Sequence, residues 1–95
     1  MRKRYLITYD VADDKRRNSV FKTLMGHGDH VQFSVFLCEL NGVELAKLKG
    51  ALNETLNHRQ DQAIMIDMGP ADNAVNSTLQ CVGKAYSPPA RVTVI

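Results

Sequence analysis

The residues best suited to chemistry lie at the end of the first apolar run of the sequence. That run begins at Tyr5, is rich in aromatic and β-branched residues, and ends in the carboxylate of Asp10, which predicts a strand with an acid at its tip. An acidic turn follows with Asp13 and Asp14, and then come three adjacent cations: Lys15, Arg16 and Arg17. Strand tips bind ligands in folds that pack helices on a sheet. The pattern predicts a divalent metal beside a phosphate-bearing partner.

Asp10 is the candidate metal ligand of this pattern. Mg²⁺ prefers oxygen ligands and keeps several waters, but one carboxylate makes a poor site on its own. A two-fold dimer would bring a second Asp10 across its axis, and a metal between the two would screen their repulsion and polarise a water for attack on a phosphodiester. Asp13 and Asp14 lie close by in the sequence, but one of them is expected to cap the next helix. The alternative is that Asp10 is only a turn residue that ends the strand.

The cations Lys15, Arg16 and Arg17 lie in the first turns of that helix. Arginine matches the geometry of phosphate, so these residues are candidate nucleic-acid contacts. The alternative is a solvated helix face paired with the preceding acids. Tyr9 and Phe36 are either core residues or stacking platforms for bases, and Ser34 is either a polar group at the site or a residue on a solvent-facing strand.

Hydrophobic periodicity predicts the elements that must position these residues. The order begins with a strand at 5–11 and a helix ending near Gly26 and Gly28. A strand region at 31–38 follows, in which Ser34 marks a kink or a switch between two strands. The remaining elements are a helix at 43–56, a strand at 63–68 and a tail strand at 91–95. This is an α+β, ferredoxin-like βαββαβ plan with an extra C-terminal strand, formed by residues 1–95 as a single domain. That fold has many functions, so it does not settle the activity.

Composition excludes few classes of function. The chain has 95 residues and a net charge of +2, but nine of its 12 Lys and Arg residues precede residue 50, which favours a surface that faces a polyanion. Cys38 and Cys81 form neither a metal pattern nor a disulfide framework, so reduced cysteines and a cytoplasmic location are expected. The first apolar segment stops at Asp10 and is too short for a signal peptide or a membrane span.

Two segments together resemble a known family, that of CRISPR-associated protein two, the small dimeric subunit of the spacer-acquisition machinery. Residues 6–17, LITYDVADDKRR, are similar to its first strand and the turn into its first helix, and residues 28–37, GDHVQFSVFL, are similar to its G-x-x-V-Q-x-S-V-F segment. Residues 67–72 and the Ser-Pro-Pro at 87–89 are similar to one branch of the family. The resemblance covers nearly the whole chain.

The resemblance implies a ferredoxin-like homodimer in which the tail, residues 79–95, completes the sheet of the partner subunit. It also implies binding of duplex DNA in spacer acquisition, as the central dimer between two dimers of an integrase partner. Some members are metal-dependent endonucleases on RNA or duplex DNA, and others are architectural. By resemblance Asp10 is the catalytic residue and the ligand of Mg²⁺ or another divalent cation. The positions of Arg16 and Arg17 are nucleic-acid contacts, and those of Tyr9, Ser34 and Phe36 flank the site.

One departure from the family is visible, because many members carry a glutamate directly after Val35 and Phe36. This chain has leucine and cysteine there and places its acid at Glu39. The remaining alternative is a ferredoxin-like RNA-binding or small-ligand regulatory domain without nuclease activity. An RNA-recognition sheet requires an aromatic pattern that residues 31–38 lack.

Overall fold

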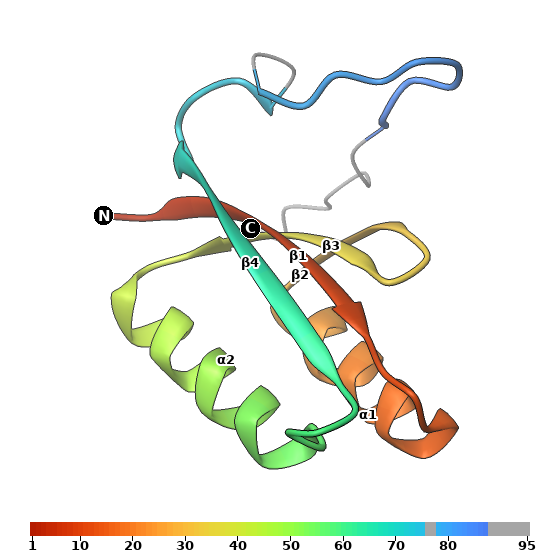
Figure 1. Cartoon of the computed structure of the whole chain (residues 1–95). Helices are drawn as coiled ribbons and strands as arrows, with labels where there is room; N and C mark the ends of the chain where they lie inside the picture. Colours follow the sequence, from red (N-terminus) through yellow and green to blue (C-terminus); the bar gives the residue numbers. More distant parts are fainter. Residues whose placement is uncertain (76–77, 88–95) are drawn as a thin grey trace, which may run out of the picture.

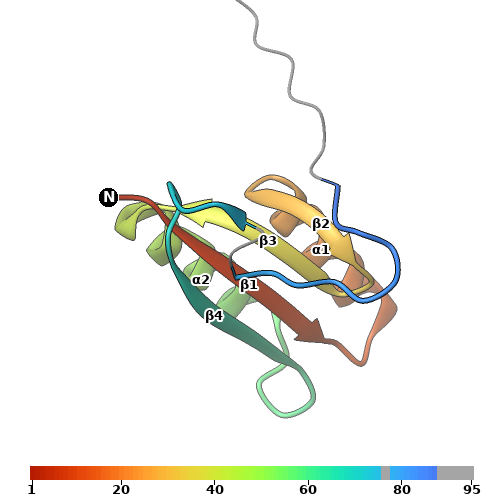
Figure 2. The same cartoon turned by 90° about the horizontal axis from the view of Figure 1, so that it is seen from above.

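An antiparallel sheet of four strands, in the order β2-β3-β1-β4, forms the centre of the molecule (Figures 1 and 2). The computed structural model describes residues 1–75 and 78–87. The elements are β1 (Lys3–Asp10), α1 (Asp14–Met25), β2 (Gly28–Gln32), β3 (Val35–Leu40), α2 (Gly42–Thr55) and β4 (Gln62–Pro70). This is the predicted α+β, ferredoxin-like βαββαβ order, and β1 is an interior strand.

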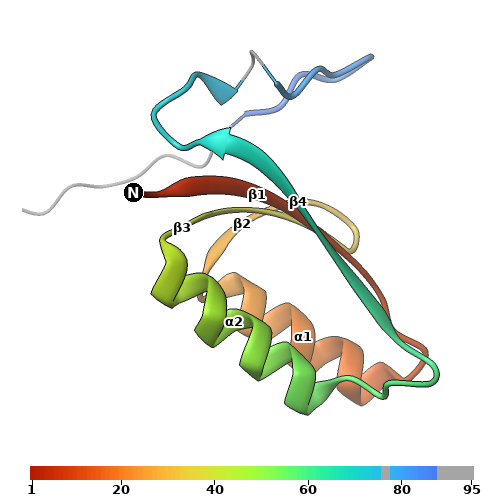
Figure 3. The ribbon, with the colours of Figure 1, turned by 60° about the vertical axis from the view of Figure 1, so that its left-hand side comes forward.

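The core lies between the sheet and the two helices, which cover the same face of the sheet (Figure 3). Side chains alternate between the faces of a strand, so Ile7 and Tyr9 of β1 point toward the helices. The buried residues that they join are Phe36, Cys38 and Leu40 of β3, Val20 and Leu24 of α1, and Leu48 and Leu52 of α2. Neither helix in the described part of the chain is long and apolar enough to cross a membrane.

The opposite face of the sheet, called here the open face, carries aliphatic residues without a layer of helices. Leu6 of β1 lies in register between Leu37 of β3 and Ile66 of β4. Ile64 and Ile66 are 46% and 47% exposed. The segments at 71–75 and 78–87 lie over this side of the sheet (Figure 3).

The predicted strand at 31–38 is two strands in the structure, because Ser34 has a φ of 63° in the turn between β2 and β3. A left-handed backbone cannot continue a strand, so the switch predicted at Ser34 is confirmed. Strand β2 begins at Gly28, earlier than expected, and β4 extends to Pro70. Residues 79–83 form no strand. The predicted tail strand at 91–95 lies outside the described residues, as do Pro88 and Pro89.

Candidate functional site

The site predicted at Asp10 lies where β1 ends. Asp10 pairs with Gln62 of β4 and is exposed. Because Ile7 and Tyr9 face the helices, the alternation of β1 places Asp10 on the side of the open face. Within residues 1–75 and 78–87, its carboxylate forms no hydrogen bond or ion pair. A carboxylate in this state is available to a metal ion or a ligand.

The acids of the following turn are occupied. Asp13 is the N-cap of α1, and its Oδ2 accepts a hydrogen bond from the main-chain N–H of Arg16 at 3.0 Å. Asp14 accepts a hydrogen bond from Nη1 of Arg17 at 2.7 Å. The helix cap predicted at Asp13 or Asp14 is therefore Asp13. Neither carboxylate is as free as that of Asp10.

Asp61, in the loop before β4, accepts hydrogen bonds from the turn that follows Asp10. Its Oδ1 accepts hydrogen bonds from the N–H of Ala12 at 2.9 Å and from Nη2 of Arg16 at 3.2 Å. Its Oδ2 accepts from Nε of Arg16 at 2.7 Å and from the N–H of Asn57 at 2.8 Å. The Asp61 side chain is fully buried, with 0% exposure. Asp61 thus fixes the backbone two residues after Asp10.

Sequence reasoning missed Asp61, since it stands alone in a polar loop and its partners are distant along the chain. Hydrogen bonds from Arg16, and then from the N–H groups of Ala12 and Asn57, hold the pKa of Asp61 well below its usual range despite burial. A depressed pKa means that the ionised carboxylate stabilises the folded state at neutral pH. This contribution is lost as the pH falls below the usual carboxylate range toward the folded-state pKa.

Asp61→Asn should therefore destabilise the protein at pH 7, because the amide cannot accept the two-point bond from Arg16. The melting temperature, measured by circular dichroism, should fall by about 5 °C or more. The difference from the wild type should shrink as the pH is lowered through about 4, where the unfolded carboxylate protonates. Asp72→Asn, on an exposed turn, is the matched control and should change little. A difference between Asp61→Asn and wild type that stays constant down to pH 2 would contradict this role.

Arg16 and Arg17, both predicted nucleic-acid contacts, also hold the turn. Arg17 donates to the main-chain oxygen of Val11 from Nε at 3.2 Å and from Nη2 at 3.0 Å. The two arginine side chains remain 27% and 34% exposed, so each is partly open to solvent. Lys15 is exposed and has no ion pair within the described residues. Lys15 is therefore a cation available to pair with a phosphate, whereas both arginines already have partners.

Tyr9, Ser34 and Phe36 lie behind Asp10. Phe36 is fully buried and Tyr9 is 7% exposed, with their ring centroids 6.3 Å apart. The N–H of Tyr9 donates to the main-chain oxygen of Ser34 at 3.1 Å, which brings the turn between β2 and β3 against the end of β1. Burial raises the pKa of the Tyr9 phenol despite a side-chain hydrogen bond with Ser34, so the phenol is neutral at neutral pH. Tyr9 and Phe36 support the site from the core.

Within the described ranges, no group of three or more His, Cys, Asp or Glu side chains is placed to hold a metal ion. Cys38 is buried, and burial raises the pKa of its thiol to about 11, so it is not a thiolate ligand at neutral pH. Glu39 pairs with Arg4 across the far end of the β1–β3 ladder, with 3.2 Å between the ionic groups. Among the described carboxylates at the end of β1, Asp10 is the one without a partner, and a single carboxylate suits Mg²⁺ only with water, phosphate or a second carboxylate.

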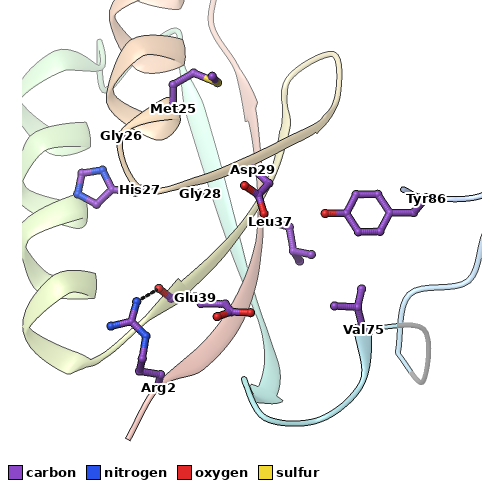
Figure 4. A pocket seen from close by; sticks show the side chains of 10 residues that line it. All are labelled: Arg2, Met25, Gly26, His27, Gly28, Asp29, Leu37, Glu39, Val75 and Tyr86. Carbon is purple, nitrogen blue, oxygen red and sulfur yellow. Dashed lines mark hydrogen bonds between the residues drawn. The ribbon is translucent and has the colours of Figure 1, made fainter. Parts of the chain in front are cut away.

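A cavity of about 450 Å³ lies at the opposite end of the β1–β3 ladder (Figure 4). Its polar lining includes His27, Asp29, Glu39 and Tyr86, and Nη2 of Arg2 donates to the main-chain oxygen of Glu39 at 2.6 Å. Asp10 and its neighbouring turn do not line this cavity. The cavity is therefore separate from the site predicted at Asp10.

Comparison with known proteins agrees with the fold described above. The family model described as "CRISPR associated protein Cas2" matches residues 2–74. A protein of Geobacter sulfurreducens named CRISPR-associated endoribonuclease Cas2 is 37% identical over 91 residues, which cover 96% of this chain and 95% of that protein. A protein of Rhodospirillum rubrum with the name CRISPR-associated endoribonuclease Cas2 1 is also 37% identical over 91 residues, 96% of this chain and 88% of that protein. The crystal structure of Streptococcus pyogenes Cas2 superposes with a TM-score of 0.73 at 26% identity, covering 84% of this chain and 99% of that one.

Proposed function

Since the chain belongs to the Cas2 family of CRISPR-associated proteins, we propose that it binds nucleic acid at the end of β1 and cleaves it with a divalent cation held by Asp10. The observation that carries this proposal is the free carboxylate. Asp13, Asp14 and Asp61 all have cationic or main-chain partners, and Asp10 has none within the described residues. The names of the relatives support a nuclease, and endoribonuclease is the activity those names state.

A homodimer would complete the site. The open face exposes Ile64 and Ile66 beside Leu6, and Asp10 lies on the same side of β1. Two copies that meet through this side would bury aliphatic surface, which is a favourable contribution to association. A two-fold axis near the end of β1 would then bring two copies of Asp10 to one cleft, as expected from the sequence. The tail, residues 79–95, is proposed to reach the sheet of the partner subunit.

The residues of this chain would act by position and charge. Asp10 would hold Mg²⁺, which binds proteins through one or two carboxylates together with waters and substrate phosphates. When bound, the cation supplies charge stabilisation at the phosphate and a more acidic water. Lys15 would contact the phosphate backbone, joined by the exposed parts of Arg16 and Arg17. The bond from the N–H of Ala12 to Asp61 and the bond from Arg17 to the oxygen of Val11 would hold the backbone of the turn after Asp10 in place when the phosphate binds.

A second candidate function is an architectural subunit that binds duplex DNA and supports spacer acquisition with an integrase partner. It is favoured by the sparse set of metal donors among the described residues of one chain and by the cations at the start of α1. Such binding would use backbone charge, so it would tolerate sequence changes and weaken with salt. An architectural subunit would retain duplex DNA regardless of metal.

The experiment that tests the nuclease is cleavage of labelled single-stranded RNA and of duplex DNA by the wild-type protein, with Mg²⁺ and with chelator. Chelation should abolish cleavage and allow it to return when Mg²⁺ is added in excess. Gel retardation of the same substrates in chelator measures binding without cleavage. Cleavage that continues unchanged in chelator would reject the metal-dependent site, and duplex DNA that is retarded but never cut would support the architectural function instead.

A further inference from the structure

Phe33 is an aromatic residue that the fold leaves in solvent. It occupies the tip of the β2–β3 hairpin and is 82% exposed. The other five aromatic side chains of Phe and Tyr type are buried or half-buried: Tyr5, Tyr9, Phe21, Phe36 and Tyr86. A single exposed ring needs no explanation in itself. The position of Phe33 relative to Asp10 is the reason to consider it as a binding residue.

The end of the β1–β3 ladder brings the turn that carries Phe33 close to Asp10. The paired residues run from Lys3 with Leu40 to Thr8 with Val35, and the N–H of Tyr9 donates to the main-chain oxygen of Ser34 at 3.1 Å. Phe33 precedes Ser34 in the turn, and Asp10 follows Tyr9 at the end of β1. The exposed ring is therefore carried by a turn that is bonded to the residue before the free carboxylate.

The turn that carries Phe33 is held in one conformation. Gln32 and Val35 pair with each other, so the turn between them contains only Phe33 and Ser34. The left-handed Ser34 is tied to β1 through the main-chain bond to Tyr9 and through the side-chain contact with the same residue. Because the turn is already held in one conformation, it loses little conformational entropy when a ligand binds.

We propose that Phe33 stacks on an unpaired nucleobase next to the phosphate bound at Asp10, and so makes the site select single-stranded over paired nucleic acid. The proposal rests on the function proposed above for Asp10. Bases that are splayed out of a helix stack on exposed aromatic side chains, and this contact tolerates any base because each has a π face. Bases within a duplex are already stacked and cannot offer that face. A ring on the turn that is bonded to the end of β1 is in a position to contact a base of a nucleotide bound at this end of the strand.

The test is binding of a single-stranded oligonucleotide that contains 2-aminopurine, measured in chelator so that no cleavage occurs. Stacking on Phe33 should quench the fluorescence of the base analogue. Phe33→Ala and Phe33→Leu should weaken binding about 10-fold or more and lose the quenching, and Phe33→Trp should restore both. Val43→Ala removes another exposed apolar side chain, on α2, and is the matched control. Affinity for a duplex of the same sequence should not change in any of these variants.

Two results would overturn the proposal. The first is wild-type affinity and quenching in both Phe33→Ala and Phe33→Leu. The second is a loss of self-association in these variants, measured by analytical ultracentrifugation, which would make Phe33 a contact between two copies of the chain. Because binding is measured without metal, the failure of cleavage would reject the nuclease while leaving the result for Phe33 intact.

Discussion

Asp10→Asn should lower the rate of metal-dependent cleavage by about 100-fold or more, which is the scale for loss of one preorganised electrostatic group at a reacting centre. The amide keeps the shape of the side chain but removes the charge that would bind the cation. Because the carboxylate has no partner within the described residues, the substitution should leave the fold intact. Cleavage is measured in single-turnover reactions on labelled RNA, together with the melting temperature.

The matched control for this substitution is Asp14→Asn. Asp14 lies in the same acidic turn, and its side chain is 88% exposed and paired with Arg17 at 2.7 Å. A pair this exposed contributes little to stability, so the control should cleave at nearly the wild-type rate. Equal loss of activity in the two variants would show that the net charge of the turn matters, and not a ligand at Asp10. Wild-type cleavage by Asp10→Asn would reject the assignment of the site.

Gly28→Ala should destabilise the protein by about 3 kcal/mol, a large share of the stability of a small domain. Gly28 pairs with Cys38 where β2 meets β3. A Cβ atom at Gly28 would lie 2.5 Å from the main-chain oxygen of Leu37 and 2.9 Å from Cα of Cys38, and it would also collide with the Cys38 sulfur. These backbone atoms cannot rotate away, so β2 would have to separate from β3. Urea unfolding gives the free energy of unfolding.

Gly50→Ala is the control for this prediction. Gly50 lies in α2, is exposed, and has no atom within 4 Å of the position that a Cβ would take. Alanine has the higher helix propensity, so this variant should be more stable by about 0.5–1 kcal/mol. Adding Cys38→Ala to Gly28→Ala should not rescue stability, because the collision with Leu37 is with the main chain. Full recovery in that double variant would show that only the sulfur opposed the added methyl group.

The elements of the fold were predictable because each depends on local sequence. Alternation in β1, the cap at Asp13 and the break at Ser34 are signals that span a few residues. The start of β2 at Gly28 was missed, since the Gly-Asp-His sequence at 28–30 has low strand propensity and is held by pairing with β3. Tertiary context overrode propensity there.

The site was only partly predictable because its supports are distant in sequence. Asp10 was visible as an acid at the tip of a strand. The bond between Arg16 and Asp61 joins residues that are 45 positions apart, and each of them alone resembles an ordinary surface charge. Arg4 could not be told apart in the sequence from the other cations that precede residue 50. In the structure it is 4% exposed and donates to the main-chain oxygens of Ala71 and Asn73. Only the folded chain reveals which charges are structural.

The two ends of β1 make this strand intolerant of a change in length. Near the start of β1, Arg4 donates hydrogen bonds to the segment at 71–73, and Asp10 is the last residue of the strand. Both residues lie on the same face, because they are an even number of positions apart. Inserting or deleting one residue between them would turn one of the two toward the helices, since each step along a strand changes the face.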